Sequence, residues 1–438
     1  MNRKFLLLYS MLLCGLVSCN STSKSTGTVQ VVEKTDSCKS DSKNSYEVYI
    51  PARHSATDKL PLLVIIDAHG NGKFALDKFR QSARQYPAIL VASDLIKNGF
   101  EGFEAAIQTL IEDVRQKYPA NETVYMTGFS GGARMALGYA LTHQLNGLIM
   151  CGALASPDQI QAVRCPVISI SGTDDFNFME TAQYLFDEQS TPTNLKIELT
   201  NASHNWPDSI LLANTWGFLS MSGKTVGTPS LPLSEFKIYC QHQQARINAL
   251  RQQVDYLKAT LLTHNMASTT PFNNDKTFAA NYQALSRNAA YTNQMKQLQK
   301  CLQFEVSMRQ PYIEDFQTKD TLWWKKEIST TNEKIKTEQN NYTKDMYRRI
   351  KGFWGIACYS LCKQAINQRN AEALNKVLAI YRMVEPENPD MLYFSAFPPY
   401  WLGNNETALS TLKQALKAGF SDQNQLKKDF PEAISSRL

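Results

Sequence analysis

The sequence predicts an α/β domain with a mostly parallel sheet, followed by an all-helical region. Strand-like and helix-like segments alternate over residues 29–222, and the segment 223–234, which contains glycine and proline, is predicted to be the interdomain linker. From residue 235 onward the periodicity is helical almost throughout. Such alternation places helices on both faces of a mostly parallel sheet. The 438 residues are enough for two or three domains.

The N-terminal 18 residues have the pattern of a secretion signal. Residues 2–4 form a short basic start, and the apolar run 5–13 is too short for a permanent membrane span. Leu16–Cys19 resembles the lipobox of bacterial lipoproteins. That resemblance implies cleavage before Cys19, its acylation with chains such as palmitate, and anchoring in the bacterial cell envelope on a periplasmic or surface face. A plain signal peptide or a retained helix is the alternative. Residues 19–28 then form a polar tether.

Eight segments of the 29–222 domain favour strands, because they are short, rich in β-branched or aromatic residues and bounded by turn residues. They are Val29–Val32, Tyr46–Ile50, Leu62–Asp67, Ile89–Ser93, Thr123–Thr127, Leu148–Ala153, Val167–Ser171 and Lys196–Thr200. The first two are joined too closely for a crossover, so we expect an antiparallel hairpin at the sheet edge.

Helical patterns separate these strands. They cover Phe74–Gln85, Gly102–Lys117, Gly131–His143, Phe178–Glu188 and Ser209–Ser220. No long insertion lies between the strands, so we expect no large lid. This favours an open site that faces a bulky or polymeric substrate.

Ser130 is the candidate nucleophile. It stands in Gly128–Gly132, a G-x-S-x-G motif between the strand Thr123–Thr127 and the next helix. In this context a serine lies on a tight turn with its hydroxyl exposed. The flanking glycines are needed because a Cβ there would collide with the neighbouring strand and helix. The motif alone is weak evidence for a nucleophile, since glycine and serine are common. The prediction depends on its position between a strand and a helix.

Two later strand ends supply an acid and a base. Asp174 and Asp175 follow the strand Val167–Ser171, and His204 follows Lys196–Thr200. A serine hydroxyl needs an imidazole to take its proton, and the imidazole needs a carboxylate to fix its tautomer. The residues leave Asp174 and Asp175 as alternatives, and the other carboxylate suits the N-terminus of the following helix.

Residues from about 46 to 220 resemble a compact α/β-hydrolase of the esterase, dienelactone-hydrolase and polyester-depolymerase kind, in which the order is also Ser, Asp, His. The matching segments are Ile65–Gly72, Thr127–Gly132, Gly172–Asp175 and His204–Pro207. In such enzymes the acid stands three residues after the strand-ending glycine, which selects Asp175. The resemblance implies a Ser130–His204–Asp175 triad, an acyl-enzyme intermediate and no cofactor.

The loop His69–Gly72 resembles the H-G-x-G loop of the same enzymes. In them this loop gives one backbone N–H to the oxyanion hole, and the residue after the nucleophile gives the other. The resemblance therefore assigns Gly70 or Asn71, together with Gly131, to the oxyanion hole. A plain turn in which His69 makes a structural hydrogen bond is the alternative.

Charge differs between the two parts of the chain. The net charge is +6 overall, with 16 basic and 21 acidic residues over 19–222 and 28 basic and 19 acidic residues from 223 onward. The basic part suits anionic lipid headgroups or the protein's own acidic domain, and a solvated helical surface is the simpler interpretation. No nucleic-acid-binding module is present. The seven cysteines after Cys19 have no regular spacing, so we predict neither a disulfide pairing nor a metal site.

The C-terminal region contains two long amphipathic patterns, Phe236–Leu262 and Phe278–Met308, within a helical region 235–345. Farther on, Asn370–Leu374 and Asn405–Leu409 align at an offset of 35. This resembles degenerate tetratricopeptide repeats over 346–438, whose period is about 34. The aromatic pairs at 323–324 and 353–354 are interpreted as core residues, and the region suits a protein partner.

Together these observations predict a membrane-anchored serine hydrolase that cleaves carboxylic esters on a small molecule or a polymer. A peptidase on the same fold is one alternative. A catalytically inactive hydrolase fold that displays its helices as a binding or assembly module is the other.

Overall fold

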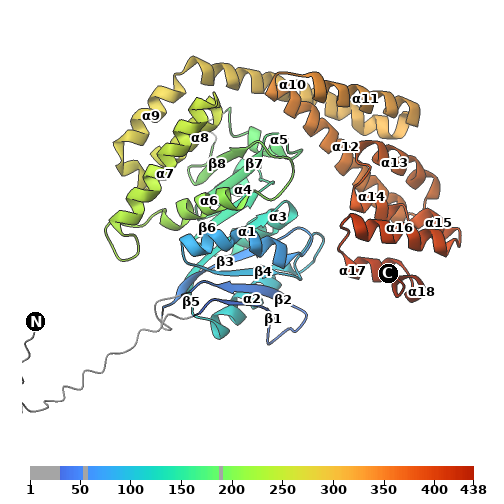
Figure 1. Ribbon diagram of the computed structural model, residues 1–438, viewed down its shortest axis with the longest axis horizontal. Helices are drawn as coiled ribbons and strands as arrows, with labels where there is room; N and C mark the ends of the chain where they lie inside the picture. The colour runs from blue at the N-terminus through green and yellow to red at the C-terminus, as the bar shows by residue number, and fades with distance from the viewer. Residues whose placement is uncertain (1–29, 53–57, 187–190) are drawn as a thin grey trace, which may run out of the picture.

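The computed structural model describes residues 30–52, 58–186 and 191–438, and within them an eight-stranded sheet comes first (Figure 1). The strands are β1 Val32–Ser37, β2 Ser45–Ile50, β3 Leu60–Ile66, β4 Ile89–Ser93, β5 Ala120–Phe129, β6 Gly147–Cys151, β7 Val167–Gly172 and β8 Leu195–Thr200. Their order across the sheet is β1-β2-β4-β3-β5-β6-β7-β8, and only β2 runs against the others. The predicted mostly parallel sheet is confirmed, and this order is that of an α/β-hydrolase fold.

Helices cover both faces of the sheet. They are α1 Gly72–Gln85, α2 Phe103–Lys117, α3 Gly131–Thr142, α4 Pro157–Ala162, α5 Phe178–Ala182 and α6 Ser209–Met221. On one face α1 and α6 bury Phe79 and Trp216, and on the other α2 and α3 bury Leu110 and Ala136. Parallel strands buried on both sides carry continuous apolar runs, as the central strands do here. We call β1 to α6 the sheet domain.

Most predicted strands and helices of this domain differ from the structure by only a few residues at their ends, and three larger differences occur. β1 begins at Val32, and Val29 lies outside the described residues. The helix expected over Phe178–Glu188 ends at Ala182, and the last two residues of that range are not described. The short α4 was not predicted, because six residues give no helical periodicity. The edge hairpin was predicted correctly, since β1 and β2 pair antiparallel.

The chain after the sheet domain is helical, as predicted. Its α-helices are α7 Leu233–Gln252, α8 Tyr256–Ala267, α9 Lys276–Ser286, α10 Ala289–Thr318, α11 Thr321–Thr337, α12 Asn341–Asn367, α13 Ala371–Val384, α14 Pro389–Phe394, α15 Phe397–Trp401, α16 Asn405–Ala418, α17 Gln423–Asp429 and α18 Glu432–Ser435. We call α7 to α18 the helical half. None of the described helices has the length and apolarity needed to cross a membrane.

Two expected long helices are each broken in the structure. Between α7 and α8 the backbone of Val254 has φ +60°, and the Asp255 side chain caps α8 by accepting from Lys258 N–H. Between α9 and α10, Asn288 caps α10. Asn and Asp are favoured caps because their side chains satisfy the free N–H groups of the first turn. Neither break contains Gly or Pro, so the amphipathic pattern continues through both.

The first helices of the helical half share a core with the sheet domain. α8 lies against the edge strand β8, where the Asn265 side-chain amide donates to the Ile197 carbonyl over 2.9 Å. Arg246 of α7 pairs with Glu198 of β8. The segment 223–234 is packed, since Leu231 is buried in the same core. Covering an edge strand in this way blocks pairing with another chain.

The later helices form a separate core. Trp324 of α11 and Trp354 of α12 are fully buried and meet edge to face, with ring centroids 5.7 Å apart. The interpretation as core residues is confirmed for these two, whereas Trp323 and Phe353 are only partly buried against the same core. Asn370 caps α13 and Asn404 caps α16, so both members of the aligned pair open a helix. The assignment to tetratricopeptide repeats stays a prediction.

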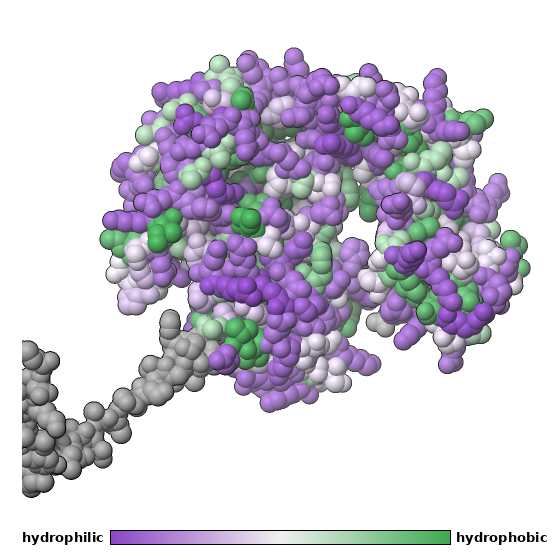
Figure 2. Space-filling model, in the orientation of Figure 1, coloured by the Kyte–Doolittle hydropathy of each residue, from purple (hydrophilic) through white to green (hydrophobic). Residues whose placement is uncertain are grey.

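The helical half forms an arc around the sheet domain. In Figure 1 it begins with α7 to α9 beside α6 and β8, crosses with α10 and α11, and returns with α12 to α18. Figure 2 shows an opening between the sheet domain and the C-terminal helices. Beyond this opening the arc contacts the sheet domain again, because Lys97 Nζ, in the β4–α2 connection, lies 2.7 Å from Asp422 Oδ2 at the start of α17.

Candidate active site

Ser130 occupies a strained turn between β5 and α3. Its φ is +53°, which an L-residue rarely adopts. Two glycines permit this turn: a Cβ at Gly128 would stand 2.3 Å from the Gly132 carbonyl carbon, and one at Gly132 would stand 2.1 Å from the Ile66 oxygen at the end of β3. The turn therefore requires the glycines that the motif supplies, and it half-exposes the serine at the carboxyl end of the sheet.

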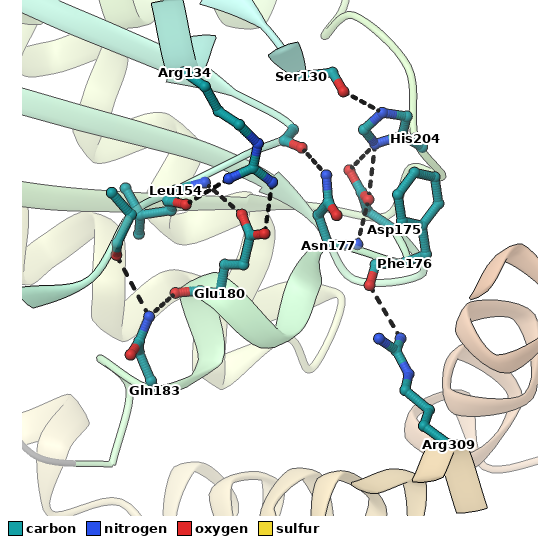
Figure 3. Close-up of polar contacts among 12 residues, drawn as sticks. Ser130, Arg134, Leu154, Asp175, Phe176, Asn177, Glu180, Gln183, His204 and Arg309 are labelled. Carbon is teal, nitrogen blue, oxygen red and sulfur yellow. Dashed lines mark hydrogen bonds and ion pairs between the residues drawn. The ribbon is translucent and has the colours of Figure 1, made fainter. Parts of the chain in front are cut away.

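Ser130, His204 and Asp175 form one hydrogen-bonded chain (Figure 3). Ser130 Oγ lies 2.9 Å from His204 Nε2, and His204 Nδ1 lies 2.9 Å from both carboxylate oxygens of Asp175. Because an ionised carboxylate only accepts, we assign the imidazole proton to Nδ1, which leaves Nε2 to accept the serine hydroxyl. The structure thus brings together the three residues predicted as the triad.

The carboxylate of Asp175 is enclosed by its own loop, Thr173–Asn177, which we call the acid loop. Asp175 is 1% exposed, and its Oδ1 accepts from the Asn177 backbone N–H over 2.8 Å. The Asn177 side chain donates to the Gly152 carbonyl at the end of β6. A buried carboxylate is stable only when it is paired and hydrogen-bonded. The acid loop therefore fixes the carboxylate toward His204.

Two aromatic rings hold the imidazole. The centroid of Phe129, next to the nucleophile, lies 4.7 Å from that of His204, and the centroid of Phe176 lies 4.2 Å from it. The side chain of His204 remains 19% exposed, so its base function is open to solvent and substrate. Phe176 was not among the predicted site residues, although it stands beside Asp175 in the chain.

Asp174 turns away from His204 and faces the helical half. Its Oδ2 lies 3.6 Å from Arg348 Nη1 of α12. Next to it, Thr173 Oγ1 donates to Asp345 Oδ2 over 2.8 Å. Burial, helped by the charge of Asp345, raises the pKa of Asp174 to about 6. The structure brings Asp175, and not Asp174, to His204.

A buried cluster of the helical half holds the acid loop. Arg349 of α12 donates to Glu305 of α10 over 2.6 and 2.8 Å and also to the Thr173 carbonyl. Arg309 of α10 donates to Glu305 and, over 3.0 Å, to the Phe176 carbonyl (Figure 3). Arg349 and Glu305 are fully buried. Residues far along the chain therefore fix both ends of the segment that carries Asp175.

The turn predicted to serve the oxyanion hole is closed on itself. The Asp67 side chain accepts from the N–H groups of His69 and Asn71 over 2.9 and 3.3 Å, and the Asp67 carbonyl accepts from Gly70 N–H. The other carboxylate oxygen of Asp67 accepts from Trp206 Nε1, two residues beyond His204. Gly70 and Asn71 therefore offer no unoccupied N–H here, which differs from the expectation.

Gly131 is placed as expected for an oxyanion donor. It is the first residue of α3, and the first N–H groups of a helix have no partner within it. The positive end of the helix dipole also lies there. The side chain of Asn98 lies directly over this glycine: a Cβ at Gly131 would meet the Asn98 Oδ1 at 1.6 Å.

One side of the site is covered, which the expectation of an open site did not include. No long insertion interrupts the sheet domain, but the helical half covers the acid loop from outside it. Gly352 of α12 passes so close that a Cβ there would lie 3.3 Å from the Cβ of Phe176. A lid would have been visible in the sequence as an insertion between strands, whereas this cover comes from a later part of the chain.

No group of three or more potential metal ligands occurs among the described residues. Their seven cysteines are all free thiols. Cys19 lies outside the described residues, so its lipidation stays a prediction.

No family model and no curated protein matches the chain. Among solved structures, it is similar to esterase B of Lactobacillus rhamnosis (TM-score 0.35, 14% identity, 43% of this chain and 86% of that chain). It is also similar to an α/β serine hydrolase without lid from Xanthomonas campestris (0.32, 18%, 43% and 93%). A third is an acylaminoacyl peptidase of Pyrococcus horikoshii (0.32, 10%, 43% and 40%). These are likenesses of fold, so the function of this chain rests on its own residues.

Proposed function

We propose that this chain is a serine hydrolase that cleaves carboxylic esters through an acyl-enzyme intermediate. The observation that supports the proposal is the hydrogen-bond chain from Ser130 through His204 to the buried carboxylate of Asp175. A hydroxyl held 2.9 Å from an imidazole, whose other nitrogen faces a carboxylate, is prepared to lose its proton upon attack.

The reaction has two similar halves. Ser130 Oγ forms a bond to the ester carbonyl carbon while His204 takes its proton, and Asp175 stabilises the resulting imidazolium. The bond to the alcohol oxygen then breaks, and His204 gives the proton to the leaving alcohol. Water next attacks the acyl-enzyme with His204 as base, which releases the carboxylic acid and restores Ser130.

The negative charge on the carbonyl oxygen needs donors near Ser130. Gly131 N–H and the N-terminus of α3 are the donors that suit this role, since they are unoccupied by the helix itself. The N–H groups of Gly70 and Asn71 are bonded to Asp67, so they would contribute only after the turn rearranges.

The first experiment is labelling of the soluble chain, from about Ser21 onward, with a fluorescent fluorophosphonate. We expect labelling, and we expect Ser130→Ala to abolish it. Paired substrates with one acyl group, a 4-nitrophenyl ester and a 4-nitroanilide, then separate esterase from peptidase: a peptidase should cleave both, whereas we expect cleavage of the ester alone. Absence of labelling in well-folded protein would refute the enzyme proposal and favour the binding-module alternative.

The predicted membrane attachment is part of the proposal. Several acyl chains on Cys19 would anchor the protein stably, whereas one chain would not. Cells that express the full chain should incorporate an alkyne analogue of palmitate into it and retain it in the membrane fraction. Cys19→Ala should lose both properties, and incorporation that persists in this variant would contradict the assignment.

A further inference from the structure

A cavity of about 660 Å³ lies between the acid loop and the helical half, and His204 is part of its wall. The sheet domain contributes Asp174, Phe176, Ser203 and His204. The helical half contributes Asn332, Ile335, Lys336, Arg348, Lys351, Gly352, Glu385 and Asn388. Its volume is within the range of small-molecule sites, roughly 300–1,000 Å³. Ser130 is not part of this wall, so His204, whose Nε2 lies 2.9 Å from Ser130 Oγ, is the triad residue that connects the cavity to the nucleophile.

Among the charged side chains of the cavity wall, two cations but only one carboxylate lack an ion-pair partner in the described part of the chain. Arg348 is engaged, because its guanidinium lies 3.2 Å from Asp345 and 3.6 Å from Asp174. Lys336 and Lys351 make no ion pair within 4 Å with a carboxylate of the described residues. The Glu385 carboxylate in the same wall accepts from the Asn388 side chain.

Of the two lysines, Lys351 gives the stronger evidence for an anion site. It is half-buried, and its ammonium donates to the neutral side-chain oxygen of Asn332 over 3.1 Å. An ammonium has three donors, so the others remain for a ligand. Burial raises the pKa of the nearby Glu385, while the charge of Lys351 opposes that rise, yet the two groups form no ion pair. A partly desolvated cation without an anionic partner is costly, and a bound anion would offset that cost.

We infer that Lys336 and Lys351 form a subsite for a carboxylate on the substrate, so that the hydrolase acts on acidic esters. The inference rests on the proposed function, because it concerns the substrate of the same Ser130. The geometry that supports it is the shared cavity: the sheet domain contributes the base His204 to its lining, and the helical half contributes the two lysines. The helical half would then determine specificity as well as support the acid loop.

Three arenesulfonyl fluorides test the charge preference without knowledge of the natural ester. They are benzenesulfonyl fluoride, its 4-carboxylate and its 4-(2-aminoethyl) derivative, which are neutral, anionic and cationic. Each forms an S–O bond to Ser130 as the S–F bond breaks, with fluoride leaving and the serine proton passing to His204. The rate of modification is followed by intact mass, with Ser130→Ala as the blank.

The measured quantity is the modification rate of the anionic reagent divided by that of the cationic reagent. We expect this ratio to be at least about tenfold higher for wild type than for the Lys336→Met/Lys351→Met double variant. Each single variant should give an intermediate ratio. Lys336 is exposed, so Lys336→Met carries little folding risk. Lys334→Met is the matched control, because this exposed lysine is on the same helix and outside the cavity wall, and it should behave as wild type.

The outcomes separate the two proposals. If the ratio of anionic to cationic rates is the same in wild type and in the double variant, the proposed carboxylate subsite is wrong. The proposal that the chain is a serine hydrolase would not be affected by that result. Failure of the anionic reagent where a fluorophosphonate still labels Ser130 would also overturn the subsite, because such a cavity excludes the carboxylate. Failure of every reagent, the fluorophosphonate included, would refute both.

Discussion

Asp174 and Asp175 are adjacent in the chain, yet they contact different parts of the molecule. Asp175 contacts His204, whereas Asp174 lies beside Arg348 of the helical half. Strand ends place both carboxylates at the same edge of the sheet, so chain spacing left both as candidates for the acid. Only the resemblance to α/β-hydrolases favoured Asp175, and its distance to His204 agrees with that choice.

Replacing Asp175 should therefore cost far more activity than stability. Asp175→Asn keeps the size of the side chain but presents an amide to His204, which favours the wrong imidazole tautomer. We expect fluorophosphonate labelling to slow on the order of 10⁴-fold. The control is Asp158→Asn, at an exposed aspartate in α4, which should label normally. A loss below about tenfold would show that Asp175 does not orient His204.

Asp174 gives a prediction about pH. Its folded pKa is raised from 3.8 to about 6, so the folded protein binds this proton more readily than the unfolded chain does. Its contribution to stability is thus present at low pH and is lost as pH rises through 6. We expect Asp174→Asn to raise the melting temperature relative to wild type at pH 7.5, with a smaller difference at pH 4.5. A difference independent of pH would contradict the raised pKa.

At the level of elements, local patterns predicted most of the sheet domain. The central strands carry apolar runs with turn residues beside them, and the turn at Ser130 requires the glycines seen in the sequence. The breaks at Val254 and Asn288 were missed, because polar caps interrupt α-helices there without any change in periodicity. The periodicity of apolar residues indicates which face of a helix is buried. It does not indicate where one helix ends and the next begins when both continue the same periodicity.

The support of the acid loop could not be predicted from sequence. Arg309, Glu305 and Arg349 lie more than 100 positions beyond Asp175, within helices of ordinary amphipathic character. Contacts between distant segments leave no spacing pattern in a single sequence. For the same reason no pattern in the chain predicted that the helical half would cover the acid loop.

We expect Arg349→Met to weaken both the fold and the site. It leaves the buried Glu305 with Arg309 as its remaining partner and removes the donor to the Thr173 carbonyl. Breaking a buried ion pair costs about 3–5 kcal/mol of unfolding free energy, measurable by urea denaturation. Arg382→Met, at an exposed position of α13, should stay within about 0.5 kcal/mol of wild type.

The same variant tests whether the cluster positions Asp175. If it does, labelling of Ser130 should slow at least about tenfold under conditions where the protein remains folded, since a small displacement of a catalytic group is costly. Arg349→Lys keeps the charge but loses the planar fork, so it should recover only part of the rate. Loss of stability with an unchanged labelling rate would mean that these helices stabilise the loop without positioning the acid.

For the whole molecule, the unequal charge of the two parts is partly explained by their contact. Arg246 of the basic helical half pairs with Glu198 of the acidic sheet domain, and Arg348 lies beside Asp174. The basic region was expected to contact anionic lipids, the protein's own acidic domain or only solvent. These two ion pairs are examples of the second of these contacts. The two parts act as one unit at the site, because the acid loop is held from both.

The contact between Lys97 and Asp422 closes the arc beside the site, since the neighbouring Asn98 lies over Gly131. Both side chains are about one-third exposed, so the ion pair contributes only ~0–1 kcal/mol and weakens with salt. If it limits access, opening it should favour large substrates. We expect Asp422→Asn, which retains a residue able to cap α17, to speed labelling by a dextran-linked fluorophosphonate several-fold. The rate with a small fluorophosphonate should not change, and high salt should have the same effect on wild type. An equal response of the two reagents would show that large molecules reach Ser130 by another path.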